Sequence, residues 1–531
     1  MQYRKRFHNM VIYDTSVTRP HLSDAAPTPV REVEVAVIGG GVGGIGLAVA
    51  LRRRGVEDFV VLDRGSDFGG TWRDNTYPGA ACDVPSHLYS FSFDHNPNWS
   101  RSFSTQPEIQ NYILGVAERH DIREKFSFDH ELIRADWDES TSRWMLSTSR
   151  GRISAKILVS AMGALCEPNM PEIEGLDRFE GPVFHSARWD HTLDLADKRV
   201  AVIGTGASAV QIVPAIASSV AHLDLFQRTA PWIFPRLLRK YSKLERLAFR
   251  RVPGLTTAFR CILYLLREIY AIVLIKFPPA TAGLGLIAGV KMRIEVRDRA
   301  LRAKVTPEFR VGCQRMLSSN EYYPALGREN VDVVTSGIAG VQKDSIVTVD
   351  GTEHRVDAIV VATGFRITDS PTFDLLHGRG GRTLTERYAE QGVSAYKGTT
   401  VSGFPNMFVI LGPNSGLGYS SAIFMIESQI NYIVDAVAAI QDQQITSVEV
   451  RPEVQDLFNS TLQRKMRKSV WVTGGCRSWF LDSTGRNVAL WPDFSFRYRK
   501  QLRTFDIESY DVVRRVESLT AGVSATPGSR R

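Results

Sequence analysis

The feature that most constrains the fold is a glycine-rich turn, "GGGVGG", at residues 39–44. It is preceded by "EVEVAVI" (32–38), whose β-branched residues are typical of a buried strand, and followed by a helical stretch rich in Ala and Leu. A second strand, "FVVLD" (59–63), completes a β-α-β unit of about 30 residues. Such a unit predicts a parallel, doubly wound sheet in an α/β domain.

The turn carries the GxGxxG pattern of dinucleotide-binding sites on Gly39, Gly41 and Gly44. The first glycine permits the tight turn, the second lets a pyrophosphate approach the backbone, and the third lets the helix pack closely on the strand. Asp63 ends the next strand, where its carboxylate can accept hydrogen bonds from ribose hydroxyls. We therefore expect a nucleotide at 39–63.

A second β-α-β unit spans 199–228 and reads GxGxxA on Gly204, Gly206 and Ala209. Arg228 stands at the position that corresponds to Asp63 in the first unit. A guanidinium can bind a 2′-phosphate that a carboxylate would repel, so this site favours NADPH over NADH. The alternative interpretation is that Arg228 is a solvated surface residue.

One site has an acidic residue where the other has a basic residue that can bind a 2′-phosphate. Two dinucleotide sites with these opposite preferences imply FAD at 39–63 and NADPH at 204–229. The five cysteines, at 82, 166, 261, 313 and 476, form no CxxC pair. We therefore expect neither disulfide redox chemistry nor a thiolate metal site, and no metal. The electrons must then pass to oxygen, a quinone or a small diffusing acceptor, and a reduced cytosolic compartment fits best.

Composition excludes several other classes of protein. The chain of 531 residues is long enough for two or three domains, with 43% hydrophobic and 23% charged residues. A net charge of +8 does not by itself indicate nucleic-acid binding. The N-terminus lacks an apolar run of signal-peptide length, and the apolar stretch 261–277 is too short and too charged for a membrane span. A cytoplasmic protein is expected.

A helical insert at 236–304 interrupts the second unit and holds 16 Lys and Arg against 4 Asp and Glu. Apolar clusters alternate with these cations, a pattern that suits peripheral binding to an anionic membrane surface. The other interpretation is that the helices pack against the NADPH domain or a second subunit while their cations are solvated. The oligomeric state stays open.

Two longer motifs add a family resemblance. "FEGPVFHSARWD" (179–190) matches FxGxxxHxxxW followed by Pro or Asp, and "GGTWRDNTYPGAACD" (69–83) matches a second family pattern. With "ATGF" (362–365) and similar C-terminal stretches, the chain resembles type I Baeyer–Villiger monooxygenases over about residues 31–510. The residues that match the first motif are Phe179, Gly181, His185, Trp189 and Asp190.

The resemblance implies an NADPH-driven monooxygenase that forms a flavin C4a-peroxide and inserts one oxygen atom of O2 next to a ketone carbonyl. The product is an ester or lactone, and the substrate a small hydrophobic ketone. Trp189 and Asp190 favour this branch over flavin monooxygenases that oxidise nitrogen or sulfur. That reaction stays as an alternative, as does a flavoprotein that mainly reduces oxygen to peroxide.

The resemblance also implies roles for single residues. Arg315 matches the family's active-site arginine, and Asp83 is implied to lie against it and set its position. His185 is implied to act in the relative motion of the two domains, against the alternative of a hydrogen-bonded core histidine. Further implied or expected contacts to FAD are Thr71, Trp72, Asp83 and Tyr89, although Tyr89 also fits a buried core aromatic. Those to NADPH are Thr205, Ser208, Gln211, Thr229, Gln314, Arg315 and the mobile-loop Trp479. Gln314 replaces the lysine usual in relatives, which places more of the NADPH preference on Arg228 and Thr229.

The predicted architecture is therefore α/β, with two Rossmann-like doubly wound dinucleotide-binding domains and a helical insert. The segments are an irregular tail (1–30), the first part of the FAD domain (31–178), a linker with the motif (179–198), the NADPH domain (199–334), the second part of the FAD domain with a C-terminal loop (335–510), and a flexible tail (511–531).

Overall fold

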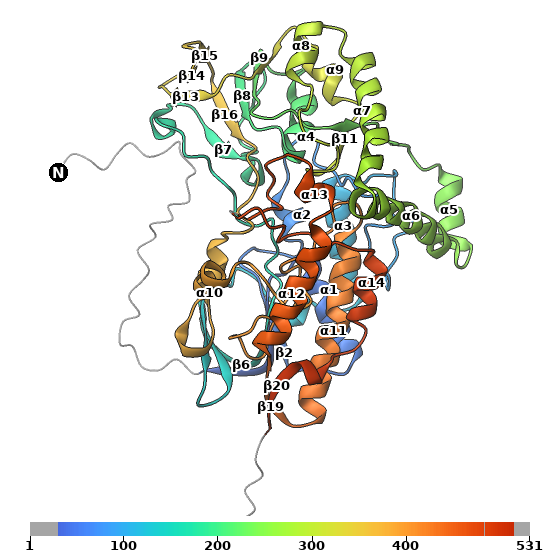
Figure 1. The fold of residues 1–531 in the computed structure, drawn as a ribbon, viewed down its shortest axis with the longest axis vertical. Helices are drawn as coiled ribbons and strands as arrows, with labels where there is room; N and C mark the ends of the chain where they lie inside the picture. The colour runs from blue at the N-terminus through green and yellow to red at the C-terminus, as the bar shows by residue number, and fades with distance from the viewer. Residues whose placement is uncertain (1–29, 483, 515–531) are drawn as a thin grey trace, which may run out of the picture.

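The computed structural model describes residues 30–482 and 484–514, which form two α/β lobes (Figure 1). The predicted tail 1–30 thus lies almost wholly outside the described residues, and so do 515–531. Each lobe is built on its own sheet, and the α/β fold class with two Rossmann-like units is confirmed.

The first sheet has eight strands, and its central parallel strands are β1 (Arg31–Ile38), β2 (Phe59–Leu62) and β6 (Gly151–Ser160). Val37 pairs with Val61 on one side and with Val159 on the other, so this core is formed by β-branched side chains. Helix α1 (Val42–Arg53) follows the glycine turn and packs on α11 (Ala422–Asp442). The remaining strands are β3 (Phe126–Ser127), β4 (Leu132–Asp138), β5 (Arg143–Thr148), β17 (Leu376–His377) and β18 (Met407–Val409).

Helix α11 is long and apolar enough to cross a membrane by length and composition. However, 78% of its apolar window is buried inside the protein. Its hydrophobic residues lie in the same core cluster as those of α1, which makes it a core helix of the first lobe.

The second sheet is parallel throughout, in the order β12–β9–β8–β16–β7. Its strands are β7 (Val183–His185), β8 (Arg199–Ile203), β9 (His222–Phe226), β12 (Val331–Val334) and β16 (Ala358–Val361), with α4 (Ala207–Ile216) after β8. Two boundaries therefore differ from prediction. Part of the segment predicted as a linker (179–198) forms the edge strand β7, which pairs with β16. Strand β16 lies in the segment assigned to the FAD domain (335–510), but it belongs to the second sheet because its main chain pairs with β8.

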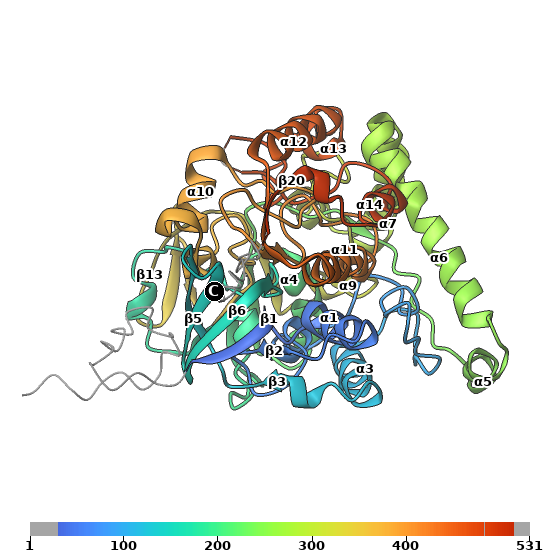
Figure 2. The same ribbon diagram turned by 90° about the horizontal axis from the view of Figure 1, so that it is seen from below.

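The insert 236–304 is helical, as predicted. It comprises α5 (Lys243–Arg251), α6 (Leu255–Ala271), a π-helical turn (Ile272–Lys276), α7 (Thr281–Glu295) and α8 (Arg299–Lys304). Figure 2 shows α6 along one flank of the molecule, with α5 at its end.

At the C-terminus, β20 (Tyr510–Arg514) pairs antiparallel with β19 (Ile445–Val450). The prediction of a flexible tail from residue 511 was therefore wrong for 511–514, where backbone pairing extends the fold. The other elements are α2 (Thr71–Asp74), α3 (Gln106–Arg119), α9 (Tyr322–Leu326), α10 (Leu384–Gln391), α12 (Pro452–Met466), α13 (Val470–Thr473), α14 (Ser495–Gln501), β10 (Ile233–Phe234), β11 (Leu317–Ser318), β13 (Ile338–Val341), β14 (Ser345–Thr348) and β15 (Glu353–Arg355).

Candidate active site

A cavity lies at the carboxyl end of β1, where the first glycine turn meets α1. Most of the residues predicted to hold the first nucleotide share its wall: Gly39, Gly41, Asp63, Thr71, Trp72 and Tyr89. Gly44 and Asp83 do not line it. The sequence did not single out Arg64, Arg73, His130, Glu131 or Met162, which also line the cavity.

Two glycines of the turn are required because a side chain at either position would collide with the neighbouring backbone. Gly39 has φ +114°, and a Cβ there would lie 2.4 Å from the carbonyl oxygen of Ala161. At Gly44 a Cβ would lie 2.0 Å from the carbonyl oxygen of Gly39, so only glycine lets α1 begin this close to the turn. The start of α1 therefore borders an open cavity with its amide groups, as a pyrophosphate requires.

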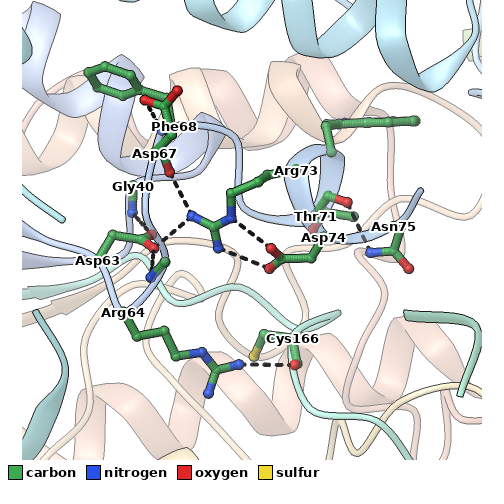
Figure 3. A network of polar contacts seen from close by, with 12 residues as sticks. Gly40, Asp63, Arg64, Asp67, Phe68, Thr71, Arg73, Asp74, Asn75 and Cys166 are labelled. Atoms are coloured by element: carbon green, nitrogen blue, oxygen red, sulfur yellow. Dashed lines mark hydrogen bonds and ion pairs between the residues drawn. The ribbon is translucent and has the colours of Figure 1, made fainter. Parts of the chain in front are cut away.

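Asp63 is fixed by a network that Figure 3 shows. Its Oδ2 accepts a hydrogen bond from the Gly40 amide at 2.5 Å, and its Oδ1 accepts one from Nη1 of Arg73 at 2.8 Å. Arg73 also pairs with Asp74. Burial by itself would lower the pKa of Arg73, but the carboxylates of Asp74 and Asp63 raise it, so Arg73 stays charged. Arg73 thus holds the acidic residue at the cavity wall.

The second glycine turn opens at the start of α4. Gly204 has φ +113°, and the space where a Cβ of Gly206 would stand is empty to 4 Å. Arg228 and Thr229 are exposed, and the Thr205 hydroxyl donates to the Thr229 carbonyl at 2.8 Å. Within residues 30–482 and 484–514, Arg228 forms no ion pair with a carboxylate. One exposed cation, an accessible glycine backbone and the start of a helix together suit a phosphorylated nucleotide.

Gln211 lies on α4 but is occupied within the protein. Its side-chain amide bonds to Tyr77 and to the main chain of Ala81, both in the motif of the first lobe. Ser208, one turn earlier, is half-buried near the start of the helix.

The two lobes meet at an ion pair. Arg315 donates from Nε to Oδ2 of Asp83 and from Nη2 to Oδ1, each at 2.7 Å, a bidentate arrangement. The carboxylate of Asp83 raises the pKa of Arg315. Burial would raise the pKa of Asp83, but the Arg315 cation outweighs it and lowers that pKa. Both groups stay ionised, and about a third of the Arg315 side chain is exposed (36%).

The segment before Arg315 is joined to the loop that carries Trp479. Gln314 donates from Nε2 to the carbonyl of Arg477 at 2.7 Å, and Cys313 forms a disulfide with Cys476. The spacing of the cysteines did not predict this bond, because it joins residues 163 positions apart that the fold brings together. Trp479 is 45% exposed and packs edge-on against Phe480.

His185 stands on β7 beside the end of β16. It is 3% exposed, its Nδ1 accepts from the Ala187 amide at 3.1 Å, and its ring packs edge-on against Phe365 of the "ATGF" turn. Burial lowers the pKa of His185 to about 4. It is therefore a neutral core histidine at neutral pH.

The other residues of the motif also make contacts within the protein. Trp189 packs edge-on against Phe184, a Cβ at Gly181 would lie 2.6 Å from the Asp357 carbonyl oxygen, and Phe179 is buried. Asp190 accepts from the amide and the hydroxyl of Thr192.

Comparisons with known proteins agree with this arrangement. A family profile described as "Pyridine nucleotide-disulphide oxidoreductase" matches residues 36–242. The chain is 49% identical to a Baeyer–Villiger monooxygenase of Streptomyces coelicolor, over 91% of this chain and 93% of the relative. It is 46% identical to a Baeyer–Villiger monooxygenase of Pseudomonas aeruginosa, over 91% and 92% of the two chains.

Solved structures show the same fold. Cyclohexanone monooxygenase from Rhodococcus sp. Phi1 bound to NADP+ is similar with a TM-score of 0.82 at 27% identity, over 92% of this chain and all of that one. An oxidised steroid monooxygenase bound to NADP is similar with a TM-score of 0.79 at 30% identity, over 91% of this chain and all of that one.

Proposed function

The chain belongs to the Baeyer–Villiger monooxygenase family, and we propose that the Arg315–Asp83 pair is the charged centre of its active site. The protein is an FAD- and NADPH-dependent monooxygenase that inserts one oxygen atom of O2 next to a ketone carbonyl and forms an ester or lactone. The bidentate contact between these two residues carries the assignment of the site.

The residues of the first lobe fit FAD. Gly39, Gly41 and the start of α1 would hold its pyrophosphate, and Asp63 its ribose, while Trp72 and Tyr89 form the wall farther along. The indole of Trp72 donates to the hydroxyl of Tyr89 at 2.9 Å, which fixes both rings. When bound, FAD reduced by NADPH supplies the activated oxygen.

Arg315 supplies a permanent positive charge for the negative charge that develops during oxygen transfer. Because its pKa is raised, it keeps its protons and acts by electrostatic stabilisation, not as an acid. A charge already in place is worth about 10²–10³ in rate, because no reorganisation is needed at the moment of reaction. Asp83 is the positioning residue, since both its oxygens are bound by Arg315.

The second lobe fits NADPH. Gly204, Gly206 and the start of α4 would receive its pyrophosphate, with Arg228 and Thr229 at the 2′-phosphate. Gln314 is bonded to the Arg477 carbonyl, so its contribution to the phosphate is smaller than that of Arg228.

Product analysis tests the reaction. The protein is incubated with NADPH, O2 and a simple cyclic ketone, and the lactone and the hydrogen peroxide are each compared with the NADPH consumed. An amount of lactone close to the amount of NADPH consumed supports the proposal. Hydrogen peroxide without lactone would assign the protein to oxygen reduction, and oxidation of an amine or sulfide without any lactone would assign it to the nitrogen- and sulfur-oxidising branch.

We also propose that helix α6 of the insert docks on an anionic lipid surface. A hydrophobic ketone would then reach the protein from the lipid. The outward face of α6 is apolar, and Ile262, Leu265, Leu266 and Ile269 are all more than half exposed (54–63%). These residues follow helical spacing and so form one stripe along the flank seen in Figure 2.

The opposite face of α6 is polar and buried. Arg260 donates to the carbonyl of His87 at 2.8 Å, and Glu268 accepts from the amide of Ser495 at 3.0 Å. The helix therefore buries Arg260 and Glu268 and exposes Leu265 and Leu266, contrary to an ordinary surface helix. Exposed Arg250 and Arg251 stand shortly before the start of α6, and their charges suit anionic headgroups. Exposed Lys276 stands after the end of α6, where its ammonium group pairs with Asp493 at 3.0 Å.

Co-sedimentation tests the docking. We expect binding to vesicles of phosphatidylglycerol with phosphatidylcholine at low salt, and weaker binding at high salt or to phosphatidylcholine alone. L265E with I269E should abolish binding, whereas L457E, at an exposed leucine of α12, should not. No binding to anionic vesicles at low salt would contradict the proposal. If the protein is instead a dimer that L265E with I269E converts to a monomer, the stripe would be assigned to contact with a second copy of the chain.

A further inference from the structure

The disulfide between Cys313 and Cys476 joins two segments of the candidate active site. Cys313 lies two residues before Arg315, and Cys476 lies three residues before Trp479. The two segments are also joined by hydrogen bonds, from the Arg310 amide to the Gly474 carbonyl at 3.0 Å and from Gln314 to Arg477. The covalent bond is thus the strongest of several contacts that hold one loop against the catalytic segment.

The two cysteine residues differ in exposure. Cys313 is fully buried, whereas Cys476 is partly exposed on a loop whose neighbours Gly475 and Arg477 are exposed. Cys476 is therefore the member of the pair that lies nearer to solvent, and the side from which we expect a small thiol to approach. The three cysteines outside the pair, Cys82, Cys166 and Cys261, do not form disulfides.

We propose that Cys313–Cys476 is a reversible redox site that sets the affinity of this enzyme for NADPH. In the disulfide form, the 474–480 loop is held beside Gln314 and Arg315. In the dithiol form, it keeps only the hydrogen bonds. The inference rests on the proposed NADPH contacts of this region, and it goes beyond them by adding a site of redox modification.

The chemistry balances with ordinary thiol reagents. In reduction, a thiolate of a dithiol attacks Sγ of Cys476, the thiolate of Cys313 leaves and takes up a proton, and the second thiol of the reagent resolves the mixed disulfide. The protein gains two thiols and the reagent becomes a disulfide. In oxidation by hydrogen peroxide, one cysteine becomes a sulfenic acid, the other displaces water from it, and one peroxide yields one disulfide and two waters.

The effect on NADPH follows from conformational entropy. A loop that is already held near its bound position loses less freedom when the nucleotide binds. Reduction should therefore raise the KM for NADPH by a factor of about 3 to 10, while kcat at saturating NADPH changes much less.

The state of the pair is measured first. The protein as isolated, and after treatment with hydrogen peroxide or dithiothreitol, is denatured, alkylated and mapped by peptide mass. We expect a linked Cys313–Cys476 peptide after peroxide and two alkylated cysteines after dithiothreitol. Trypsin should cut after exposed Arg477 faster in the reduced protein, because the loop is freed. Two alkylated cysteines after every treatment would overturn the proposal.

The kinetics and controls follow. KM for NADPH and the Kd for NADP+ are measured in both states of the wild type, of C313S, of C476S and of C261S. In C313S and C476S, both constants should equal those of the reduced wild type and should not change with peroxide or dithiothreitol. In C261S, both constants should change as they do in the wild type. A linked peptide with the same KM and Kd in both states would also overturn the proposal. Absence of lactone in both states would instead count against the proposed function.

Discussion

The Tyr77 hydroxyl donates to Oε1 of Gln211 at 2.9 Å, across 134 residues of sequence. Gln211 also accepts from the Ala81 amide at 3.3 Å and donates to the Ala81 carbonyl at 2.9 Å. Tyr77 and Ala81 belong to the first lobe and Gln211 to α4 of the second. Three hydrogen bonds thus join the two lobes at this point, and the contact between Gln211 and NADPH remains a prediction.

Removing this junction should destabilise the protein. We expect Q211A to lower the free energy of unfolding by about 1–3 kcal/mol, because it leaves the half-buried Tyr77 hydroxyl and the Ala81 main chain without partners. Y77F should cost about 1 kcal/mol. In a double-mutant cycle measured by urea unfolding, the two effects should be less than additive. Strict additivity would mean that the two side chains do not interact in solution.

Arg228 should determine the choice of nucleotide. R228A is expected to raise the KM for NADPH about 10- to 150-fold and to leave the KM for NADH nearly unchanged, because only NADPH carries the 2′-phosphate. The matched control is R328A, at an exposed arginine of the same lobe, which should change neither constant. Equal losses with both nucleotides would remove Arg228 from the phosphate site.

Gln314 should matter less for that choice. Its amide is used by the Arg477 carbonyl, so Q314A should change the KM for NADPH by less than about 5-fold. If Q314A discriminated against NADPH as strongly as R228A, Gln314 would have to release Arg477 and bind the phosphate itself.

His87 should make the stability depend on pH. Its ring is enclosed by Tyr241, Phe249 and Phe259, and burial, with the nearby charges of His95 and Arg260, lowers its pKa to about 4. A histidine whose folded pKa is lowered stabilises the fold above its unfolded value near 6.5, and this contribution is lost as the pH falls from 6.5 towards 4.

At pH 5 the loss amounts to about 2 kcal/mol relative to neutral pH. H87F keeps an aromatic ring in the same enclosure and cannot be protonated. Unfolding of H87F should therefore depend less on pH between 7 and 5 than unfolding of the wild type. Parallel pH profiles for the two proteins would show that His87 does not titrate in this window.

The sequence allowed the fold class, both glycine turns and the Arg315–Asp83 contact to be predicted, because these depend on local patterns and on long motifs. Asp83 and Arg315 are 232 residues apart, and their contact was implied by the family resemblance, with Asp83 at the end of the second motif. Arg73 was missed although it lies inside one of those motifs. Its role depends on ion pairs between its side chain and those of Asp63 and Asp74. The spacing of these residues in the sequence does not predict such pairs.

Other features depend on tertiary contacts alone. Strand β7 is too short to have a periodicity of its own, and it forms because β16 offers its edge. The partner of Cys313 is set by how the 474–480 loop folds over the second lobe. For α6, the apolar stretch was visible in the sequence, but which face is exposed depends on where Arg260 and Glu268 find partners.

The catalytic claim is tested most directly by the product yield of R315A per NADPH consumed, with a cyclic ketone as substrate. FAD content and circular dichroism are checked alongside, because R315A leaves the Asp83 carboxylate without its partner. R315K, which keeps a single charge without the bidentate contact, serves as the matched variant. We predict that R315A still binds FAD and lets NADPH reduce it, while lactone formation falls by at least about 10²-fold and R315K lies between. Lactone formation by folded, FAD-loaded R315A at a rate near that of the wild type would contradict the assignment of Arg315.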